Sequence, residues 1–117
     1  MSDIYNLLNS FNFKIKSNHV LGAWMQIPSI IIADIISNKK FDFVTLDMEH
    51  GSIFLEHIQD LSQVIKNNNS IPLVRVNKPD VSIAKKALEQ GAGGIILPMI
   101  ESVKQFEEIA KHLIYPP

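Results

Sequence analysis

Short apolar runs alternate along this chain with longer stretches in which apolar residues recur every three or four positions. The short runs are bounded by turn residues and predict β-strands, and the longer stretches predict amphipathic helices. An opening helix is followed by four strand-then-helix units within 117 residues. Because each helix must cross over in a right-handed sense before the next strand begins, the pattern predicts a parallel sheet and an α/β fold.

The predicted elements follow one another with short turns between them. The opening helix covers Ile4–Ile15. The four predicted strands are Val20–Met25, Phe41–Asp47, Ile71–Val76 and Gly94–Pro98. Residues typical of helix starts precede the other helices, namely Ser29, Ser52, Lys78-Pro79-Asp80 and Ser102. Gly91 predicts the end of the helix that begins after Asp80.

Two architectures contain such units. One is a small open, doubly wound sheet, and the other is half of an eight-stranded βα barrel, whose usual length is ~250 residues. The element pattern by itself does not choose between them. In both architectures ligands bind at the carboxyl ends of the strands, so the residues that follow the strands are the candidate site.

Charge and composition exclude several classes of function. Lys and Arg total 11 and Asp and Glu total 12, a formal net charge of -1, which lacks the basic cluster of a nucleic-acid-binding protein. No apolar run approaches the ~20 residues that a membrane span needs. The chain has no Cys, and its first residues lack the basic start and apolar core of a signal peptide. We therefore expect a cytoplasmic protein with neither a nucleic-acid nor a membrane partner.

The predicted strands deliver polar and aromatic residues to one edge of the sheet. They are Trp24 and Gln26 from the first strand, Asp47, Glu49 and His50 from the second, Arg75 and Asn77 from the third, and Pro98 and Glu101 from the fourth. Among them, Trp24, Glu49 and Pro98 are candidate substrate-binding residues. Carboxylates, an imidazole and a guanidinium on one edge provide a general base and a donor that stabilises an anion.

His50 follows the carboxylates of Asp47 and Glu49. A neighbouring acid raises the basicity of an imidazole and fixes its tautomer, so a catalytic base is one interpretation. A loop histidine that hydrogen-bonds to the backbone is the other. The same three residues are ligand types for magnesium, manganese or zinc. Alternate strand residues point to opposite faces, which argues against a single ion bound by all three, and no complete metal site is predicted.

Arg75 lies within the apolar run Leu73–Val76. An unpaired charge is costly to bury, so the guanidinium should have an anionic partner. That partner is either a substrate carboxylate or enolate, or Asp47 or Glu49 in a structural ion pair. The spacing leaves both alternatives open.

Six segments occur in a fixed order along nearly the whole chain. They are Leu21-Gly22-Ala23-Trp24, residues 41–51 with the motif Asp-x-Glu-His-Gly, Leu73-Val74-Arg75-Val76, Gly91-Ala92, Leu97-Pro98-Met99 and Tyr115-Pro116-Pro117. Together they resemble the HpcH/HpaI aldolase/citrate lyase family, the metal-dependent class II pyruvate aldolases. The motif Asp-x-Glu-His-Gly directly after a strand is the most specific part of this resemblance.

The resemblance implies that residues 1–117 form the first half of a (β/α)8 TIM barrel. It implies a carbon–carbon lyase that reversibly cleaves a 2-keto-3-deoxy sugar acid, or another 2-keto-4-hydroxy acid, to pyruvate and an aldehyde. The reaction passes through a pyruvate enolate held on a divalent metal, such as Mg, Mn or Co, whose ligands belong to the second half. In its full-length form the protein is expected to be a homo-oligomer that acts on a small keto acid.

The resemblance also implies roles for individual residues. His50 matches the catalytic base, and Arg75 matches the arginine that stabilises the developing enolate charge. Asp47 supports the histidine, and Trp24 forms part of the pocket wall. Glu89 stands where the family usually has an Asp, which increases the basicity of the histidine and in some members comes from an adjoining subunit.

Besides Glu89, two features depart from the family pattern. Lys40 stands where the family usually has a glycine, and the chain stops before the Gly/Arg-rich loop and the metal-binding Glu and Asp of later strands. We therefore expect the isolated chain to be inactive and, with two apolar sheet edges unpaired, to oligomerise, to aggregate or to need a complementary half. The alternatives are an acyl-CoA lyase or citrate-forming relative, a truncated non-catalytic half-barrel, and a binding module unrelated to aldolases.

Overall fold

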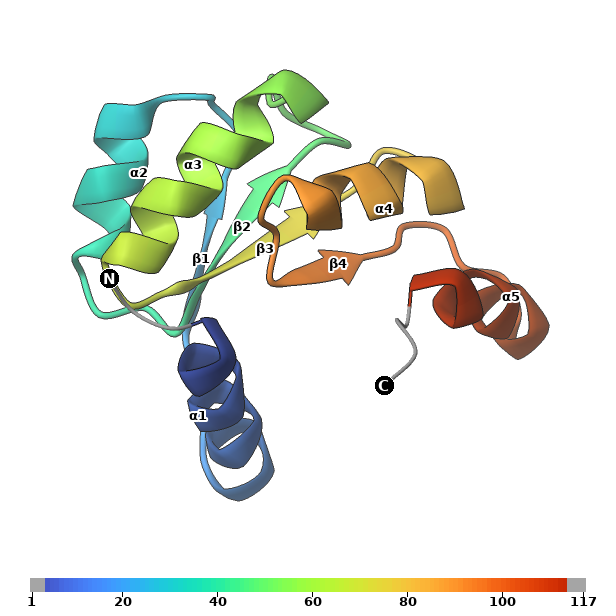
Figure 1. The fold of residues 1–117 in the computed structure, drawn as a ribbon, viewed down its shortest axis with the longest axis horizontal. Coiled ribbons are helices and arrows are strands. Elements are labelled where there is room, and N and C mark those ends of the chain that lie inside the picture. Colours follow the sequence, from blue (N-terminus) through green and yellow to red (C-terminus); the bar gives the residue numbers. More distant parts are fainter. Residues whose placement is uncertain (1–3, 114–117) are drawn as a thin grey trace.

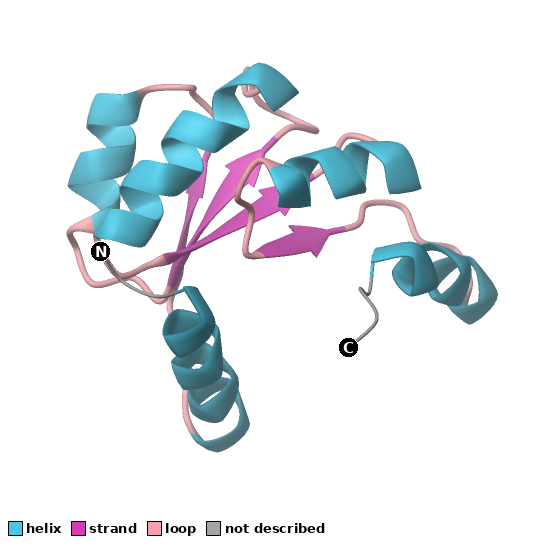
Figure 2. Ribbon diagram, in the orientation of Figure 1, coloured by secondary structure: helices cyan, strands magenta, loops and turns pink. Residues whose placement is uncertain are grey.

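Five helices and four strands alternate along residues 4–113, which are the residues that the computed structural model describes (Figure 1 and Figure 2). The helices are α1 Ile4–Ser17, α2 Ile30–Ser37, α3 Leu55–Asn67, α4 Val81–Glu89 and α5 Val103–Leu113. The strands are β1 Gly22–Met25, β2 Phe43–Asp47, β3 Ile71–Arg75 and β4 Gly94–Ile96. The predicted order of elements is confirmed. The segment Tyr115-Pro116-Pro117 lies outside the described residues.

The four strands form one parallel sheet in the order β1-β2-β3-β4. Helices α2, α3 and α4 lie on one face of this sheet, and α1 stands at the end where the strands begin (Figure 1). A doubly wound sheet would change direction in its strand order and carry helices on both faces. The sequential order is that of a βα barrel, so the predicted α/β fold with barrel-type winding is confirmed.

The hydrophobic core lies between the sheet and the helices on this face. Val44 and Leu46 on β2 and Val74 on β3 are fully buried there. Ile58 and Leu61 of α3 recur at helical spacing and belong to the same buried cluster. Burying a side chain of this kind contributes about 1.5–3 kcal/mol. This packed layer holds the strands in register and so fixes where the residues at the strand ends lie.

Most of the predicted helix starts are confirmed by side-chain caps. Ser29 Oγ accepts a hydrogen bond from a first-turn N–H of α2 at 3.2 Å. Asp80 accepts one from the first turn of α4 at 2.7 Å. Ser102 Oγ accepts one from the Gln105 N–H at 3.1 Å, before α5. Each cap satisfies a backbone donor that the helix itself leaves without a partner.

The predicted cap at Ser52 is wrong. Helix α3 begins at Leu55, with Phe54 at the N-cap position. The Ser52 N–H donates to the Gln26 carbonyl at 2.8 Å, which holds Ser52 in the turn that follows β2. The Phe54 N–H donates to Nδ1 of His57 at 2.9 Å, so a histidine side chain takes the place of the expected serine.

The predicted element ends differ from the observed ones by a few residues. Helix α1 continues to Ser17, and β4 ends at Ile96 instead of Pro98. Gly91 ends α4 as predicted, with a φ of 114° that favours glycine. None of the described helices combines the length and the apolar character needed to cross a membrane.

Lys40 adopts a backbone conformation that favours glycine. Its φ is 65°, in the left-handed region, in the turn between α2 and β2. Lys40 is the residue that stands where the family resemblance predicts glycine. For an L-residue with a side chain, this conformation costs about 1–2 kcal/mol.

We therefore expect Lys40→Gly to raise the free energy of unfolding. The gain should be about 0.5–1 kcal/mol, because part of the relieved strain is offset by the greater entropy of glycine in the unfolded chain. Urea unfolding followed by circular dichroism, at one protein concentration, measures it. Lys39→Gly is the matched control, since Lys39 lacks a positive φ and the substitution should lower stability or leave it unchanged. Equal effects of the two substitutions would contradict the explanation.

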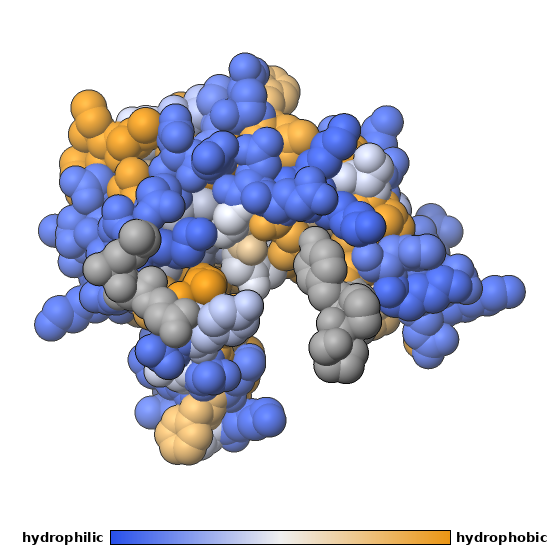
Figure 3. Space-filling model, in the orientation of Figure 1, coloured by the Kyte–Doolittle hydropathy of each residue, from blue (hydrophilic) through white to orange (hydrophobic). Residues whose placement is uncertain are grey.

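Both edges of the sheet are flanked by apolar surface. Strands β1 and β4 each have one hydrogen-bonded neighbour. Beside β1, helix α2 exposes Ile30, Ile31 and Ile35, and apolar surface gathers over this helix (Figure 3). A groove beside β4 is lined by Leu88, Ile95, Leu97, Phe106, Ala110 and Leu113. Strands with one open edge, bordered by apolar side chains, favour pairing with another chain.

The isolated 117-residue chain should therefore associate in solution. Size-exclusion chromatography with light scattering should give a mass above 13.2 kDa. Leu97→Lys, which adds a charge to the groove beside β4, should reduce the association. Phe13→Lys is the control, because Phe13 is 76% exposed on α1, away from both edges. A single monomeric species that unfolds cooperatively would contradict this expectation.

Candidate active site

Asp47 is the centre of a polar cluster at the carboxyl edge of the sheet. It is the last residue of β2 and is fully buried. The register of the sheet pairs it with Arg75, the last residue of β3. Arg75 Nε donates to Asp47 Oδ1 at 3.1 Å, and Nη2 donates to Oδ2 at 2.6 Å. The anionic partner that Arg75 requires is thus an internal carboxylate, bound by two parallel hydrogen bonds.

Four further donors surround the Asp47 carboxylate. The Trp24 indole N–H donates to Oδ2 at 3.1 Å, and the Gln26 side-chain amide donates to the same oxygen at 3.4 Å. The backbone N–H groups of Glu49 and His50 donate to Oδ1 at 2.9 and 3.1 Å. Both carboxylate oxygens are therefore fully engaged, and the loop that carries His50 is fastened to the end of β2.

The pKa of Asp47 reflects these donors. Burial by itself would raise the pKa, because desolvation disfavours the charged form. The hydrogen bonds from Arg75, Trp24 and the backbone N–H groups outweigh it and hold the pKa well below the usual value. The hydrogen bond to Asp47 likewise raises the pKa of Arg75. At neutral pH both groups are charged, and Asp47 is not available to act as a base.

Arg75 still presents one edge of its guanidinium away from Asp47. Nη1 lies 3.4 Å from Glu49 Oε1, and the arginine side chain is 24% exposed. The ring of Trp24 lies beside the guanidinium, with 5.1 Å between Arg75 Cζ and the ring centroid. The cation is therefore held by Asp47 and Trp24 while Nη1 faces Glu49.

His50 is an exposed member of the cluster, with 68% of its side chain accessible. Its Nε2 lies 3.4 Å from Glu49 Oε1, the same oxygen that faces Arg75 Nη1. Asp47 contacts His50 through the backbone N–H, and no imidazole contact with Asp47 is recorded in the described chain. The contact between Asp47 and His50 is therefore made through the main chain.

Two predicted site residues take no part in the hydrogen bonds and ion pairs of this cluster among the described residues. Glu89 is the exposed last residue of α4, and α4 runs back toward the end of the sheet where the strands begin (Figure 1). Within one chain, Glu89 is therefore at the opposite edge from His50. Pro98 follows β4 and is buried, so it offers little surface to a ligand.

The structure adds one residue, Gly51, to the predicted site and shows the contact of another, Gln26. Gln26 belongs to the cluster because its side chain reaches Asp47. Gly51 is needed because a Cβ there would lie 2.7 Å from the Gln26 carbonyl oxygen and 2.9 Å from that of Asp47. A glycine directly after the polar motif was the available signal for this close approach. Gln26 carried no signal beyond its place after a strand.

The described residues do not form a site for a divalent metal. Between residues 4 and 113, no three His, Cys, Asp or Glu side chains converge in a way that could hold an ion. Asp47 directs both oxygens at hydrogen-bond donors, and Glu49 faces the cation of Arg75. This arrangement of donors suits an oxygen or an anion near Arg75, and a cation there would meet the guanidinium.

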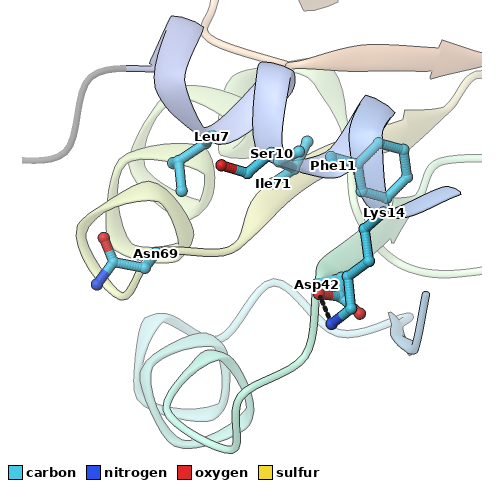
Figure 4. A pocket seen from close by; sticks show the side chains of 7 residues that line it. All are labelled: Leu7, Ser10, Phe11, Lys14, Asp42, Asn69 and Ile71. Atoms are coloured by element: carbon cyan, nitrogen blue, oxygen red, sulfur yellow. Dashed lines mark hydrogen bonds and ion pairs between the residues drawn. The ribbon is translucent and has the colours of Figure 1, made fainter. Parts of the chain in front are cut away.

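A separate pocket lies at the other edge of the sheet, beneath α1 (Figure 4). Lys14 Nζ and Asp42 Oδ1 are 2.8 Å apart at one side of it. Phe11 of α1 packs edge-on against Phe43 at the start of β2. Its lining residues are Leu7, Ser10, Phe11, Lys14, Asp42, Asn69 and Ile71. Its charged groups neutralise each other, so these contacts fasten α1 to the sheet and offer no group for chemistry.

Comparison with known proteins links the chain to a family. The family model described as HpcH/HpaI aldolase/citrate lyase matches residues 21–117. A hydroxypyruvate/pyruvate aldolase of Roseobacter denitrificans is 33% identical over 111 residues, which cover 94% of this chain and 43% of that protein. Other curated relatives are named 2-keto-3-deoxy-L-rhamnonate aldolase. The chain spans roughly two fifths of the length of the curated relatives it matches.

Solved structures give the same picture. An HpcH/HpaI aldolase from Desulfitobacterium hafniense matches with a TM-score of 0.79 and 25% identity, over 91% of this chain and 42% of that chain. The citrate synthase SbnG matches with a TM-score of 0.76 and 29% identity, over 85% of this chain and 41% of that chain. The four-stranded sheet is thus similar to part of the TIM barrel of these proteins.

Asp47→Asn should destabilise the fold. The amide keeps the shape of the side chain but leaves Arg75 without its counter-charge, and we expect a loss of about 2–3 kcal/mol in the free energy of unfolding. The loss is smaller than for a fully buried pair, since Arg75 retains some contact with water. Urea unfolding of the two proteins measures the difference. Asp60→Asn, at an exposed position of α3, is the control and should change little.

The stability difference between wild type and Asp47→Asn should also depend on pH. The pKa of Asp47 is lower in the folded chain than the ordinary value of 3.8 that applies when unfolded. The stabilisation is therefore complete above that value and is lost as the pH falls below it toward the folded pKa. Melting temperatures should differ by a constant amount above about pH 5 and converge below about pH 4. A difference that persists unchanged under acid conditions would contradict the ion-pair explanation.

Proposed function

We propose, given that this chain belongs to the HpcH/HpaI aldolase/citrate lyase family, that it supplies the base and the cation of a carbon–carbon lyase. The enzyme reversibly cleaves a 2-keto-3-deoxy sugar acid, or another 2-keto-4-hydroxy acid, to pyruvate and an aldehyde. The observation that carries the proposal is the position of Glu49 Oε1, 3.4 Å from both His50 Nε2 and Arg75 Nη1. A substrate oxygen at this place would meet a base and a cation together.

His50 is the proposed base. In the cleavage direction its imidazole removes the proton of the substrate 4-hydroxyl, and the freed electron pair forms the carbonyl of the leaving aldehyde. The bond between C3 and C4 breaks, and its electrons pass to the keto acid as the enolate of pyruvate. Protonation of the enolate at C3 then gives pyruvate. The high exposure of the His50 side chain supports this role, because the ring is open to a ligand.

Arg75 is the proposed electrostatic stabiliser. Negative charge develops on the keto-acid oxygen only as the carbon–carbon bond breaks, and Nη1 is directed toward that side of the cluster. Because Asp47 already fixes the guanidinium, little reorganisation is needed when the charge appears. Asp47 is thus a positioning residue for Arg75 and, through its backbone contacts, for His50.

The remaining predicted site residues have supporting roles in the proposal. Trp24 and Glu49 line the substrate side of the cluster, and Pro98 shapes its border after β4. Glu89 would reach His50 only from an adjoining subunit, because it lies at the opposite edge of its own sheet. This placement supports the expectation of a homo-oligomer.

In this proposal the described residues act without a metal ligand among them. The family is one of class II, metal-dependent aldolases, and a divalent ion polarises the keto acid when it is bound. The described residues do not provide its ligand set, so in our proposal they act as base, cation and supports. The further expectations of a cytoplasmic protein and a small keto-acid substrate rest on composition and on the family.

A citrate-forming enzyme or an acyl-CoA lyase is the second candidate. The likeness to the citrate synthase SbnG, at 29% identity, favours it. Both candidates use an enolate stabilised by Arg75, so the described cluster suits either one. Three assays distinguish the candidates: release of pyruvate from a 2-keto-4-hydroxy acid, cleavage of a 3-hydroxyacyl-CoA to acetyl-CoA and a carbonyl compound, and formation of citrate with free coenzyme A from oxaloacetate and acetyl-CoA.

A chimera tests the proposed roles. Residues 1–117 would replace the matching segment of the Roseobacter denitrificans aldolase, and the product should cleave a 2-keto-4-hydroxy acid. His50→Ala in this chimera should lower kcat by about 10²–10⁴-fold, the contribution of a general base. Arg75→Lys should lower it by about 10²–10³-fold, because lysine cannot hold Asp47 with two bonds and direct a third donor at the substrate.

His112→Ala is the control for the histidine, since His112 is exposed in the last turn of α5 and should leave turnover unchanged. Circular dichroism must show that each variant keeps its fold. Near-normal turnover in either His50→Ala or Arg75→Lys would refute the assigned role.

A further inference from the structure

Trp24 contacts both members of the central ion pair. Its indole N–H donates to Asp47 Oδ2 at 3.1 Å, the same oxygen that receives the 2.6 Å bond from Arg75. Its ring lies beside the guanidinium, 5.1 Å from Arg75 Cζ to the ring centroid. One side chain thus restrains the carboxylate by a hydrogen bond and the cation by a cation–π contact.

A residue that served only as apolar wall would not need these contacts. Trp24 is on β1, an edge strand, and is 46% exposed. The register places it opposite Thr45, two positions before Asp47, so the indole reaches diagonally along the sheet to the carboxylate. Phenylalanine would supply the same apolar ring without the N–H. The contacts are therefore specific to tryptophan.

The contacts act on different motions of the guanidinium. The two hydrogen bonds to Asp47 fix the Nε and Nη2 atoms of Arg75. They leave the plane of the guanidinium free to tilt about the line that joins Nε to Nη2. The ring of Trp24 lies beside the guanidinium and restricts this tilt. With both restraints in place, Nη1 faces Glu49 Oε1 at 3.4 Å, on the side of His50.

We infer that Trp24 is a positioning residue for Arg75: through its N–H on Asp47 and its ring beside the guanidinium, it holds Nη1 directed at the oxygen position shared with His50. The catalytic consequence rests on the proposed function, whereas the effect on Arg75 does not. Trp24 thus orients the guanidinium of Arg75, in addition to lining the pocket.

The sequence makes the effect on Arg75 directly measurable. Arg75 is the sole arginine and Trp24 the sole tryptophan of the chain, so the Arg75 Nε–H and the Trp24 indole N–H each give one identifiable NMR resonance. In the 117-residue chain, Trp24→Leu should raise the solvent exchange rate of the Arg75 Nε–H at least several-fold. Trp24→Phe, which keeps a ring and loses the N–H, should have a smaller effect. Phe54→Leu, which removes an exposed aromatic ring on another element, is the control and should have none.

A change in the backbone spectrum away from the strand ends would identify a general loss of structure, and Trp24→Phe then serves as the milder variant. An unchanged Arg75 Nε–H in both tryptophan variants would overturn the inference. This result does not depend on any enzymatic activity.

Kinetics in the chimera supply the second readout. If Trp24 positions Arg75, Trp24→Leu should lower kcat by about tenfold or more with a small change in KM, because the enolate charge is absent from the bound substrate and develops only as the carbon–carbon bond breaks. A rise in KM with kcat unchanged would instead indicate a pocket wall and would overturn the inference. A chimera that folds but has no lyase activity would refute the proposed function, and the exchange rates would still decide the role of Trp24.

Discussion

The buried carboxylate of Asp47 is the interaction on which the candidate site depends. A charge without exposure to water is tolerated only when it is paired and hydrogen-bonded. The parallel register supplies the pair by placing Arg75 opposite Asp47 on the neighbouring strand. The remaining donors then come from β1 and from the loop after β2. One electrostatic requirement therefore organises three consecutive strand ends.

This requirement also divides the roles of the charged residues. Asp47 does not act as a base, because both of its oxygens already accept hydrogen bonds. Through these hydrogen bonds it orients Arg75 and the backbone of His50. His50 remains exposed and free to meet a ligand. A cation that is oriented during folding stabilises a developing negative charge better than one that must reorient at the moment of reaction. The geometry is thus consistent with electrostatic preorganisation around an oxygen.

The sequence predicted much of this arrangement because its signals are local. Apolar periodicity located the strands and helices, and polar residues at strand ends located the edge that holds Asp47, His50 and Arg75. The cap at Ser52 was mispredicted because the backbone of that residue is used by the turn after β2. The contact of Trp24 with Asp47 was not predictable, since it depends on a diagonal reach between strands. Glu89 matched a family position, but the direction of α4 places it at the other edge.

The positions of the base and the cation depend on the inner strands. His50 follows β2 and Arg75 ends β3, and both of these strands have neighbours on each side. Trp24 is the exception, because it reaches the ion pair from β1, an unpaired edge. A chain that pairs with β1 would therefore shift Trp24 directly and change the orientation of Arg75 through Trp24. Asp47 would keep its place, because the backbone of its own loop holds it. Completion of a barrel around this sheet would in that way adjust the orientation of the cation without rebuilding the pair that holds it.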